Sequence, residues 1–184
     1  MNLLIVKESD FISPGMIRVE GRRSEHIKCV LRAKEGDLVR TGILGGNTTF
    51  AKVVKSERAF AELAVESFDS PPPQKTDIIP IIALPRPQSF KKTLHFIASA
   101  GIPKAYFIGA EKVEKSYWKS SALEPSAIEE ELMLGLEQGM DTIMPQLEFR
   151  TSFREFIRST EPVELSTGAN CLIAHPGTDS AECP

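Results

Sequence analysis

Three consecutive prolines divide the sequence into two parts with different patterns. They lie within Asp69–Lys75, where each proline removes a backbone hydrogen-bond donor and keeps the chain extended. Because neither a helix interior nor a central strand tolerates such a run, we interpret this stretch as a linker. The predicted organisation is a first domain at residues 1–70, a linker at 71–76 and a second domain at 77–184.

Residues before the prolines favour short strands. Gly45-Gly46-Asn47 lies between two apolar runs and suits the positive φ values of a tight hairpin. Ser24 is placed to cap a short helix in which Ile27, Val30 and Leu31 share one face. A small β-barrel with one helix fits this pattern, with strands expected at Met16–Val19, Leu38–Leu44, Thr48–Lys55 and Phe60–Phe68.

After the prolines, strand patterns alternate with helix patterns, which predicts an α/β fold with a largely parallel sheet. The expected strands are Ile78–Leu84, covered on both faces, then Ala105–Ile108, Leu147–Phe149 and Cys171–Ala174. The expected helices are Ser89–Ala100 with a stop at Gly101, a second one opening with a Ser126–Glu129 capping box and ending before Pro145, and Thr151–Arg158.

The charge of the whole chain argues against a strongly basic coat, because 25 acidic residues outnumber 22 basic ones. The charge is unevenly distributed along the chain. The segment from Ile17 to Arg40 contains seven basic residues and four acidic ones. A basic face of this size is compatible with RNA phosphates, and an ordinary solvated surface accounts for it equally well.

Cysteine usage and the N-terminal residues bear on location. The three cysteines are too scattered for a zinc site or a disulfide framework. The apolar start, Met1–Val6, is too short for a signal peptide or a membrane span. We therefore expect a cytoplasmic protein without a metal or a membrane partner.

No familiar catalytic motif is present, so the catalytic residue is unknown. His175 and Pro176 follow an apolar run, at the kind of strand end where open α/β sheets bind ligands. Arg86, between two prolines, holds a similar position and suits a phosphate or a carboxylate. His26 is a candidate RNA contact, whereas His95 is expected to pack.

Two further polar or aromatic pairs have alternative interpretations. Glu137-Gln138 either ends a helix in solvent or faces a substrate or cofactor. Tyr117 and Trp118 could stack on a base, but packing under a loop is favoured.

Five short motifs, in this order, resemble those of the RsmE family of the SPOUT superfamily, bacterial methyltransferases that modify uridine N3 in small-subunit ribosomal RNA. The motifs are His26–Asp37 with its H…VLR…GD pattern, Ala83–Arg86, Gly101-Ile102, Glu137-Gln138 followed by Pro145, and His175-Pro176. The resemblance implies an N-terminal PUA-like RNA-binding β-barrel followed by an α/β domain with a trefoil knot, and a homodimer. It also implies S-adenosylmethionine as the methyl donor and 16S rRNA or the small ribosomal subunit as the partner.

The resemblance also assigns candidate residues. His175 and Pro176 would border the cofactor. The reaction would be methyl transfer to the N3 of a flipped-out uridine, deprotonated by a base that the motifs do not identify. The implied RNA-binding residues are Arg22, Arg23, His26, Lys28, Arg32 and Arg86.

The sequence departs from the family pattern at several points. Phe96 and Ser99 replace a lysine and a glutamate, and Asp141 stands where an arginine is expected. The GPEGG loop and the final LG…RILR…ETA segment would follow Pro184, so we expect a SPOUT domain that is incomplete at its C-terminus. Two alternatives stay open: a non-catalytic PUA-like RNA-binding protein with a degenerate α/β domain, and an unrelated α/β metabolic enzyme.

Overall fold

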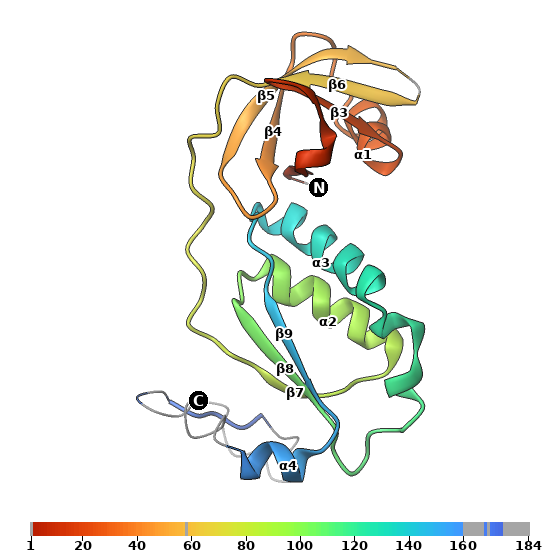
Figure 1. Ribbon diagram of the computed structural model, residues 1–184, viewed down its shortest axis with the longest axis vertical. Helices are drawn as coiled ribbons and strands as arrows, with labels where there is room; N and C mark the ends of the chain where they lie inside the picture. Colours follow the sequence, from red (N-terminus) through yellow and green to blue (C-terminus); the bar gives the residue numbers. More distant parts are fainter. Residues whose placement is uncertain (1, 58, 160–167, 169, 175–184) are drawn as a thin grey trace.

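The two parts of the chain form two sheets at opposite ends of an elongated molecule (Figure 1). The structure, a computed structural model, describes residues 2–57, 59–159, 168 and 170–174. A curled sheet with one short helix lies at one end. A smaller sheet with helices lies at the other end, and the extended linker runs along the side between them.

The curled sheet has six strands in the order β1-β4-β5-β6-β3-β2, and it forms a half-barrel rather than a closed one. Only the β1–β4 pair is parallel. Gly45, with a φ of 80°, turns the predicted hairpin between β4 and β5. The strands are β1 (Leu4–Val6), β2 (Phe11–Ser13), β3 (Met16–Glu20), β4 (Leu38–Ile43), β5 (Thr48–Ser56) and β6 (Phe60–Ala64), with a 3-10 turn at Glu8–Asp10.

The helix of this part begins earlier than its sequence indicates. α1 (Arg22–Glu25) follows Gly21, whose φ of 59° suits glycine, and continues as a π-helical turn over His26–Val30. Ser24 was expected as the N-cap, but it is buried inside the helix. Its Oγ donates to the Gly21 carbonyl oxygen (2.9 Å) instead of accepting from the backbone.

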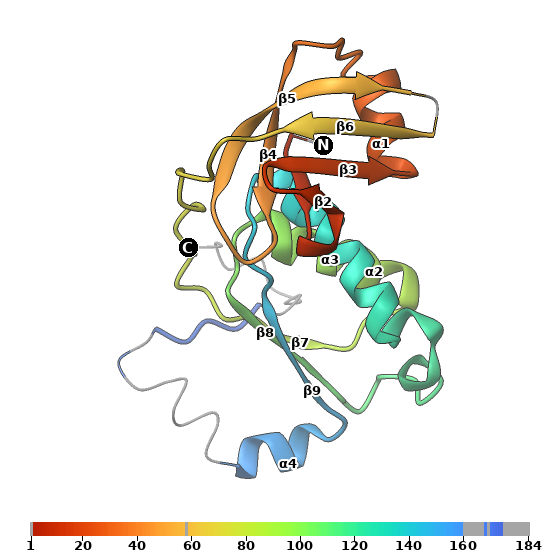
Figure 2. The same ribbon diagram turned by 45° about the horizontal axis from the view of Figure 1, so that its top comes forward.

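The second sheet is parallel, in the order β7-β8-β9, and helices α2 and α3 pack on one of its faces (Figure 2). Phe90 of α2 meets the ring of Phe107 edge-on, and Phe149 stacks on Phe107. The elements are β7 (Ile81–Ala83), α2 (Pro87–Ser99), β8 (Lys104–Ile108), 3-10 turns at Tyr117–Lys119 and Ser121–Leu123, α3 (Pro125–Gly139), β9 (Gln146–Arg150) and α4 (Phe153–Arg158).

Two of the strand predictions differ from the structure. β7 lies within the predicted Ile78–Leu84, but Ile81 is 45% exposed rather than covered, because α2 and α3 pack on the opposite face of the sheet, from which Ile82 projects. Cys171–Ala174 is not a strand, and Leu172 and Ile173 are about nine-tenths exposed at 88% and 93%. None of the described strands pairs with it, so its backbone has no ladder to join.

The predicted capping box at Ser126–Glu129 is also wrong. Pro125 takes the first position of α3, where a fixed φ and a missing N–H are favourable. Glu124 is therefore the N-cap, Ser126 lies inside the helix, and no side chain caps the helix start.

Strand β1 packs into both hydrophobic cores. Leu4 and Val6 lie in the core of the curled sheet, whereas Leu3 and Ile5 lie in the core formed with α2 and α3. Successive side chains of a strand point to opposite faces, so one short segment serves both parts. The predicted boundary between domains remains a prediction, but this strand belongs to both cores.

The linker is fastened rather than free. Near its start, Ser70 exchanges backbone hydrogen bonds with Thr48 (2.7 and 3.1 Å). Near its end, Lys75 Nζ pairs with Asp141 and donates to the Ile143 carbonyl oxygen at 2.8 Å. Asp141 is buried, so Lys75 neutralises a carboxylate that would otherwise be costly in the interior.

The contact between the two parts leaves no room for a side chain at Gly42. A Cβ there would lie 2.5 Å from Thr142 Cγ2 and 3.1 Å from Thr48 Cγ2. We predict that Gly42→Ala lowers the free energy of unfolding by about 2 kcal/mol through overpacking, measured by urea denaturation. Gly46→Ala is the matched control, because its Cβ would meet only ordinary contacts from 3.5 Å.

Thr142→Ser tests the cause, because it removes the crowding methyl and keeps the hydroxyl that donates to the Gly46 carbonyl oxygen. The double variant G42A/T142S should recover part of the loss. Equal destabilisation by the single and the double variant would contradict this explanation.

Candidate nucleic-acid interface

Arg23, one of the predicted RNA contacts, is held inside the curled part. Its guanidinium donates to both carboxylate oxygens of Asp10 (2.6 and 2.8 Å) and to the Ile5 carbonyl oxygen (3.1 Å). Burial alone would raise the pKa of Asp10, but hydrogen bonds from Arg23 and the Lys7 backbone outweigh it and lower that pKa. The hydrogen bond to Asp10 likewise raises the pKa of Arg23. Arg23 therefore holds α1 against β1.

Arg22 reaches across to the second part of the chain. Its Nη2 lies 2.9 Å from Oε2 of Glu137, a side chain with no exposed surface near the end of α3. Burial raises the pKa of Glu137, and the charge of Arg22 opposes that shift. The interpretation of Glu137 as a solvated helix end is therefore wrong. Its neighbour Gln138 contacts His95, with Oε1 and Nε2 2.9 Å apart.

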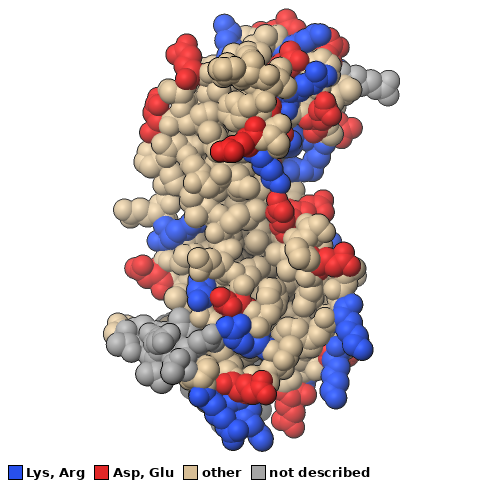
Figure 3. Space-filling view, viewed as in Figure 1, with Lys and Arg blue, Asp and Glu red and all other residues tan. Residues whose placement is uncertain are grey.

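The groove between α1 and α3 has mixed charge. It has a volume of about 450 Å³, and Lys7 and Glu129 form an ion pair across it at 2.6 Å. Figure 3 shows acidic and basic side chains interleaved over this face of the molecule. A phosphate beside the arginines would meet four carboxylates, which disfavours the groove itself as a phosphate site. Its lining residues include Asp10, Glu20, Arg22, Arg23, Glu129 and Glu130.

The other predicted RNA contacts near α1 lie at the C-terminal end of the α1 segment, by which we mean α1, the π-helical turn that continues it and the turn at Arg32. His26 is half-buried, whereas Lys28 and Arg32 are exposed. Arg32 has a φ of 53°, a left-handed conformation that costs a non-glycine residue about 1 kcal/mol. The turn is closed by a hydrogen bond from the Ala33 N–H to the Ile27 carbonyl oxygen at 3.0 Å. The strained backbone thus directs an arginine outward at the end of the helix.

Arg86 lies in another region of the molecule. It is the exposed N-cap residue of α2, just beyond the carboxyl end of β7. In both ribbon views this sheet edge lies far from α1 (Figures 1 and 2). Gly109 lies at the same edge, just after β8. A Cβ at this position would lie 2.0 Å from the Thr151 carbonyl oxygen, so the two backbone segments approach too closely for a side chain. The structure therefore does not bring Arg86 together with the α1 residues, and His175 and Pro176 lie outside the described residues.

The aromatic pair packs, as expected. Tyr117 and Trp118 lie against the core of the second part, and the Tyr117 hydroxyl donates to Glu114 at 3.1 Å. Among the described residues, no group of three or more histidine, cysteine or acidic side chains could hold a metal ion. Within the same residues, no helix is long and apolar enough to cross a membrane.

Comparison with known proteins agrees with the family motifs. A family model for the RNA methyltransferase domain matches residues 72–182. The chain is 26% identical over 159 residues to ribosomal RNA small subunit methyltransferase E 1 of Borreliella burgdorferi, covering 86% of the chain and 65% of the relative. It is 24% identical over 157 residues to ribosomal RNA small subunit methyltransferase E of Treponema pallidum, covering 85% and 59%. The chain thus spans less than two thirds of either relative.

A solved structure shares the fold. It is the ribosomal RNA small subunit methyltransferase E of Neisseria gonorrhoeae bound to S-adenosylmethionine, with a TM-score of 0.62 at 17% identity, covering 85% of this chain and 64% of that one. The expected mixed α/β class is confirmed by this match. The chain belongs to the RNA methyltransferase family. Within it, the curated relatives confirm the RsmE-type resemblance that the motifs indicated.

The pair between Arg22 and Glu137 provides a stability prediction. Arg22→Ala should lower the free energy of unfolding near pH 7 by about 2 kcal/mol, because a buried carboxylate loses its cation. Glu137 has a raised pKa, so its contribution is greatest below its ordinary value of 4.5 and is lost as pH rises through the raised value. The loss in Arg22→Ala should therefore shrink as the pH falls towards 4.5, because the buried carboxyl takes up a proton before an ordinary glutamate does. Urea denaturation at several pH values measures this.

Glu137→Gln is the control, because it removes the buried charge and keeps the shape of the side chain. The double variant R22A/E137Q should be nearly as stable as E137Q alone. A double variant as unstable as R22A, or a loss independent of pH, would show that the ion pair is not the cause.

Proposed function

We propose that this chain acts in methyl transfer from S-adenosylmethionine to N3 of a uridine in 16S rRNA, in the cytoplasm and on the small ribosomal subunit. The observation that carries the proposal is the joining of two features in one chain. The second part matches the RNA methyltransferase domain, and the curled sheet presents Lys28 and Arg32 outward. The names of the two curated relatives support small-subunit ribosomal RNA as the substrate class.

The RNA-binding residues that we propose fall into two roles. Lys28 and Arg32 are exposed and reach solvent without a carboxylate bound to them in the described contacts, so they suit phosphates. His26 lies at the base of the same turn. Arg22 and Arg23 hold the α1 segment through Glu137 and Asp10, so they position the surface rather than contribute most of its phosphate contacts.

The cofactor that the family implies fits the described residues only in part. Bound S-adenosylmethionine supplies an electrophilic methyl group. At the carboxyl edge of the second sheet, Arg86 offers an exposed cation suited to a carboxylate, and Ala83, the last residue of β7, is exposed at the same edge. Neither residue lines one of the two grooves described in this structure. His175 and Pro176 stay proposed as neighbours of the cofactor.

The activity can be tested on the substrate itself. The full chain, labelled S-adenosylmethionine and small ribosomal subunits lacking the modification should yield 3-methyluridine on nucleoside mass spectrometry. A dimer, measured by sedimentation, is expected in the active preparation. Label in a different nucleoside would contradict the assignment of the position.

A non-catalytic RNA-binding protein is the second candidate, and two departures from the family favour it. Phe96 replaces a charged residue and is 64% exposed on α2. Asp141 replaces an arginine and is bound internally by Lys75. Calorimetric titration with S-adenosylmethionine separates the two candidates: heat of binding supports the enzyme, whereas silence with retained RNA binding supports the module.

Arg32 allows RNA binding to be separated from stability. Arg32→Gly should leave the free energy of unfolding unchanged within about 1 kcal/mol, because relief of the left-handed strain offsets the added freedom of the unfolded chain. RNA affinity should fall several-fold, and the salt dependence of binding should weaken by about one phosphate contact. Fluorescence anisotropy at several salt concentrations measures both quantities.

Lys91→Ala is the matched control, because it removes one positive charge from α2, where Lys91 pairs with Glu131. It should change RNA affinity less than Arg32→Gly does. If the two variants bind RNA equally well, Arg32 is not a specific contact.

A further inference from the structure

The outward face of the hairpin β4–β5 carries an exposed aromatic ring. Phe50 is 61% exposed and Leu38 is 64% exposed. In the strand register, Arg40 lies opposite Phe50, and Leu38 lies opposite Lys52. Residues directly opposite each other in an antiparallel pair project from the same face of the sheet. These four residues, Leu38, Arg40, Phe50 and Lys52, form one patch, which we call the Phe50 face.

The core of the curled sheet does not require this ring. The alternating residues Val39, Ala51 and Val53 point inward and are buried in that core. The other aromatic on the outer side of this sheet is Phe60, whose ring is covered by the Arg18 guanidinium at 3.8 Å. In the described part of the chain, no such cation–π contact involves Phe50. Its ring is therefore open to a ligand.

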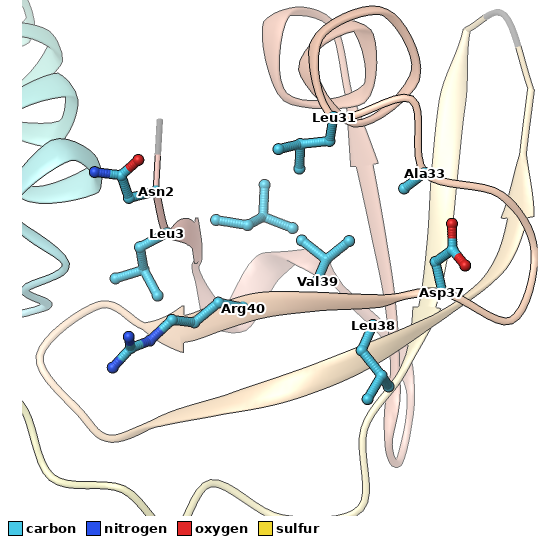
Figure 4. A pocket seen from close by; sticks show the side chains of 9 residues that line it. Asn2, Leu3, Leu31, Ala33, Asp37, Leu38, Val39 and Arg40 are labelled. Carbon is cyan, nitrogen blue, oxygen red and sulfur yellow. The ribbon is translucent and has the colours of Figure 1, made fainter.

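A groove lies on the other side of β4. It has a volume of about 380 Å³, and buried Leu3, Leu4 and Val39 give it an apolar floor. Figure 4 shows Val39 pointing into the groove and Leu38 pointing to the opposite side of the strand. Arg40 borders the groove as well as the Phe50 face. The two features are therefore contiguous across one strand.

The charge around the Phe50 face is complementary to phosphate. Arg40 lies opposite Phe50 and Lys52 lies two residues further along β5, and Arg40 donates a hydrogen bond to Met140 Sδ at 3.3 Å, which is a weak acceptor. Asp37, the residue before β4, already accepts a hydrogen bond from the Lys34 N–H at 2.8 Å. An open aromatic ring between two cations is the arrangement that binds single-stranded nucleic acid, with the base on the ring and phosphates on the cations.

We infer that the Phe50 face binds single-stranded RNA, with one unpaired base stacked on Phe50 and the neighbouring phosphates on Arg40 and Lys52. The inference rests on the proposed function and adds to it a second RNA contact, on the sheet rather than on the α1 segment. It also specifies the substrate as RNA with an unpaired nucleotide next to the modified region, because a base inside a duplex cannot expose its face to the ring.

Binding of a fluorescein-labelled oligouridine to the full chain tests the inference. Phe50→Leu keeps an apolar side chain and removes the aromatic face, so the dissociation constant should rise about tenfold. Phe50→Trp should retain binding, and its added fluorescence should be quenched when the strand stacks on it. Ile12→Ala is the control, because Ile12 is an exposed apolar residue of the same sheet, on the edge strand β2.

The outcomes separate this inference from the proposed function. Unchanged affinity in Phe50→Leu, with a loss in Arg32→Gly, overturns the stacking face and leaves the proposed function standing. No binding of the strand or of the ribosomal subunit by the unmodified chain overturns both. Equal binding to the same strand carrying abasic sites also overturns stacking. A change in sedimentation on Phe50→Leu would instead identify the face as a contact between copies of the chain.

Discussion

The whole arrangement depends on the hydrogen bonds and packing of the first few residues. The backbone N–H groups of Asn2 and Leu3 both donate to the Glu137 carbonyl oxygen at 3.0 Å, so the N-terminal strand satisfies an otherwise unpaired acceptor at the end of α3. Immediately afterwards, alternate side chains enter the two cores. The buried Glu137 carboxylate then meets Arg22 of α1. One strand and one helix end therefore set the relative position of both parts.

Local sequence patterns predicted most of the elements, because the apolar periodicity and the turn residues that indicate an element lie within it or next to it. Four of the six strands of the curled sheet, β3, β4, β5 and β6, were located to within a few residues, whereas the short strands β1 and β2 were not predicted. The failures share a different cause. Pro125 competed with Ser126 for the helix start, and Ser24 found a carbonyl acceptor instead of an amide donor. For Cys171–Ala174, an apolar run cannot show whether a neighbouring strand is available to pair with it.

The site was less predictable because its partners are distant in sequence. The family resemblance implied Arg22 and Arg23 as RNA contacts, yet their side chains pair with carboxylates from α3 and from the 3-10 turn before β2. In the sequence, Asp141 stands where the family pattern has an arginine. Only the fold shows that its carboxylate forms an ion pair with Lys75. The exposure of Phe50, by contrast, could have been predicted from the sequence. Pairing the two predicted strands as a β4–β5 hairpin places Phe50 opposite Arg40, on the solvent side of the sheet.

The fastening of the linker at Ser70 and Lys75 has a geometric consequence. A linker that is bound to the rest of the chain at both ends does not act as a hinge. Strand β1, which packs into both cores, also opposes rotation of one part against the other. The distance between the exposed turn at Arg32 and the sheet edge at Arg86 is therefore fixed by the fold. Under the proposed function, an RNA that contacted both residues would have to present two nucleotides at that separation, so its folded shape would contribute to recognition.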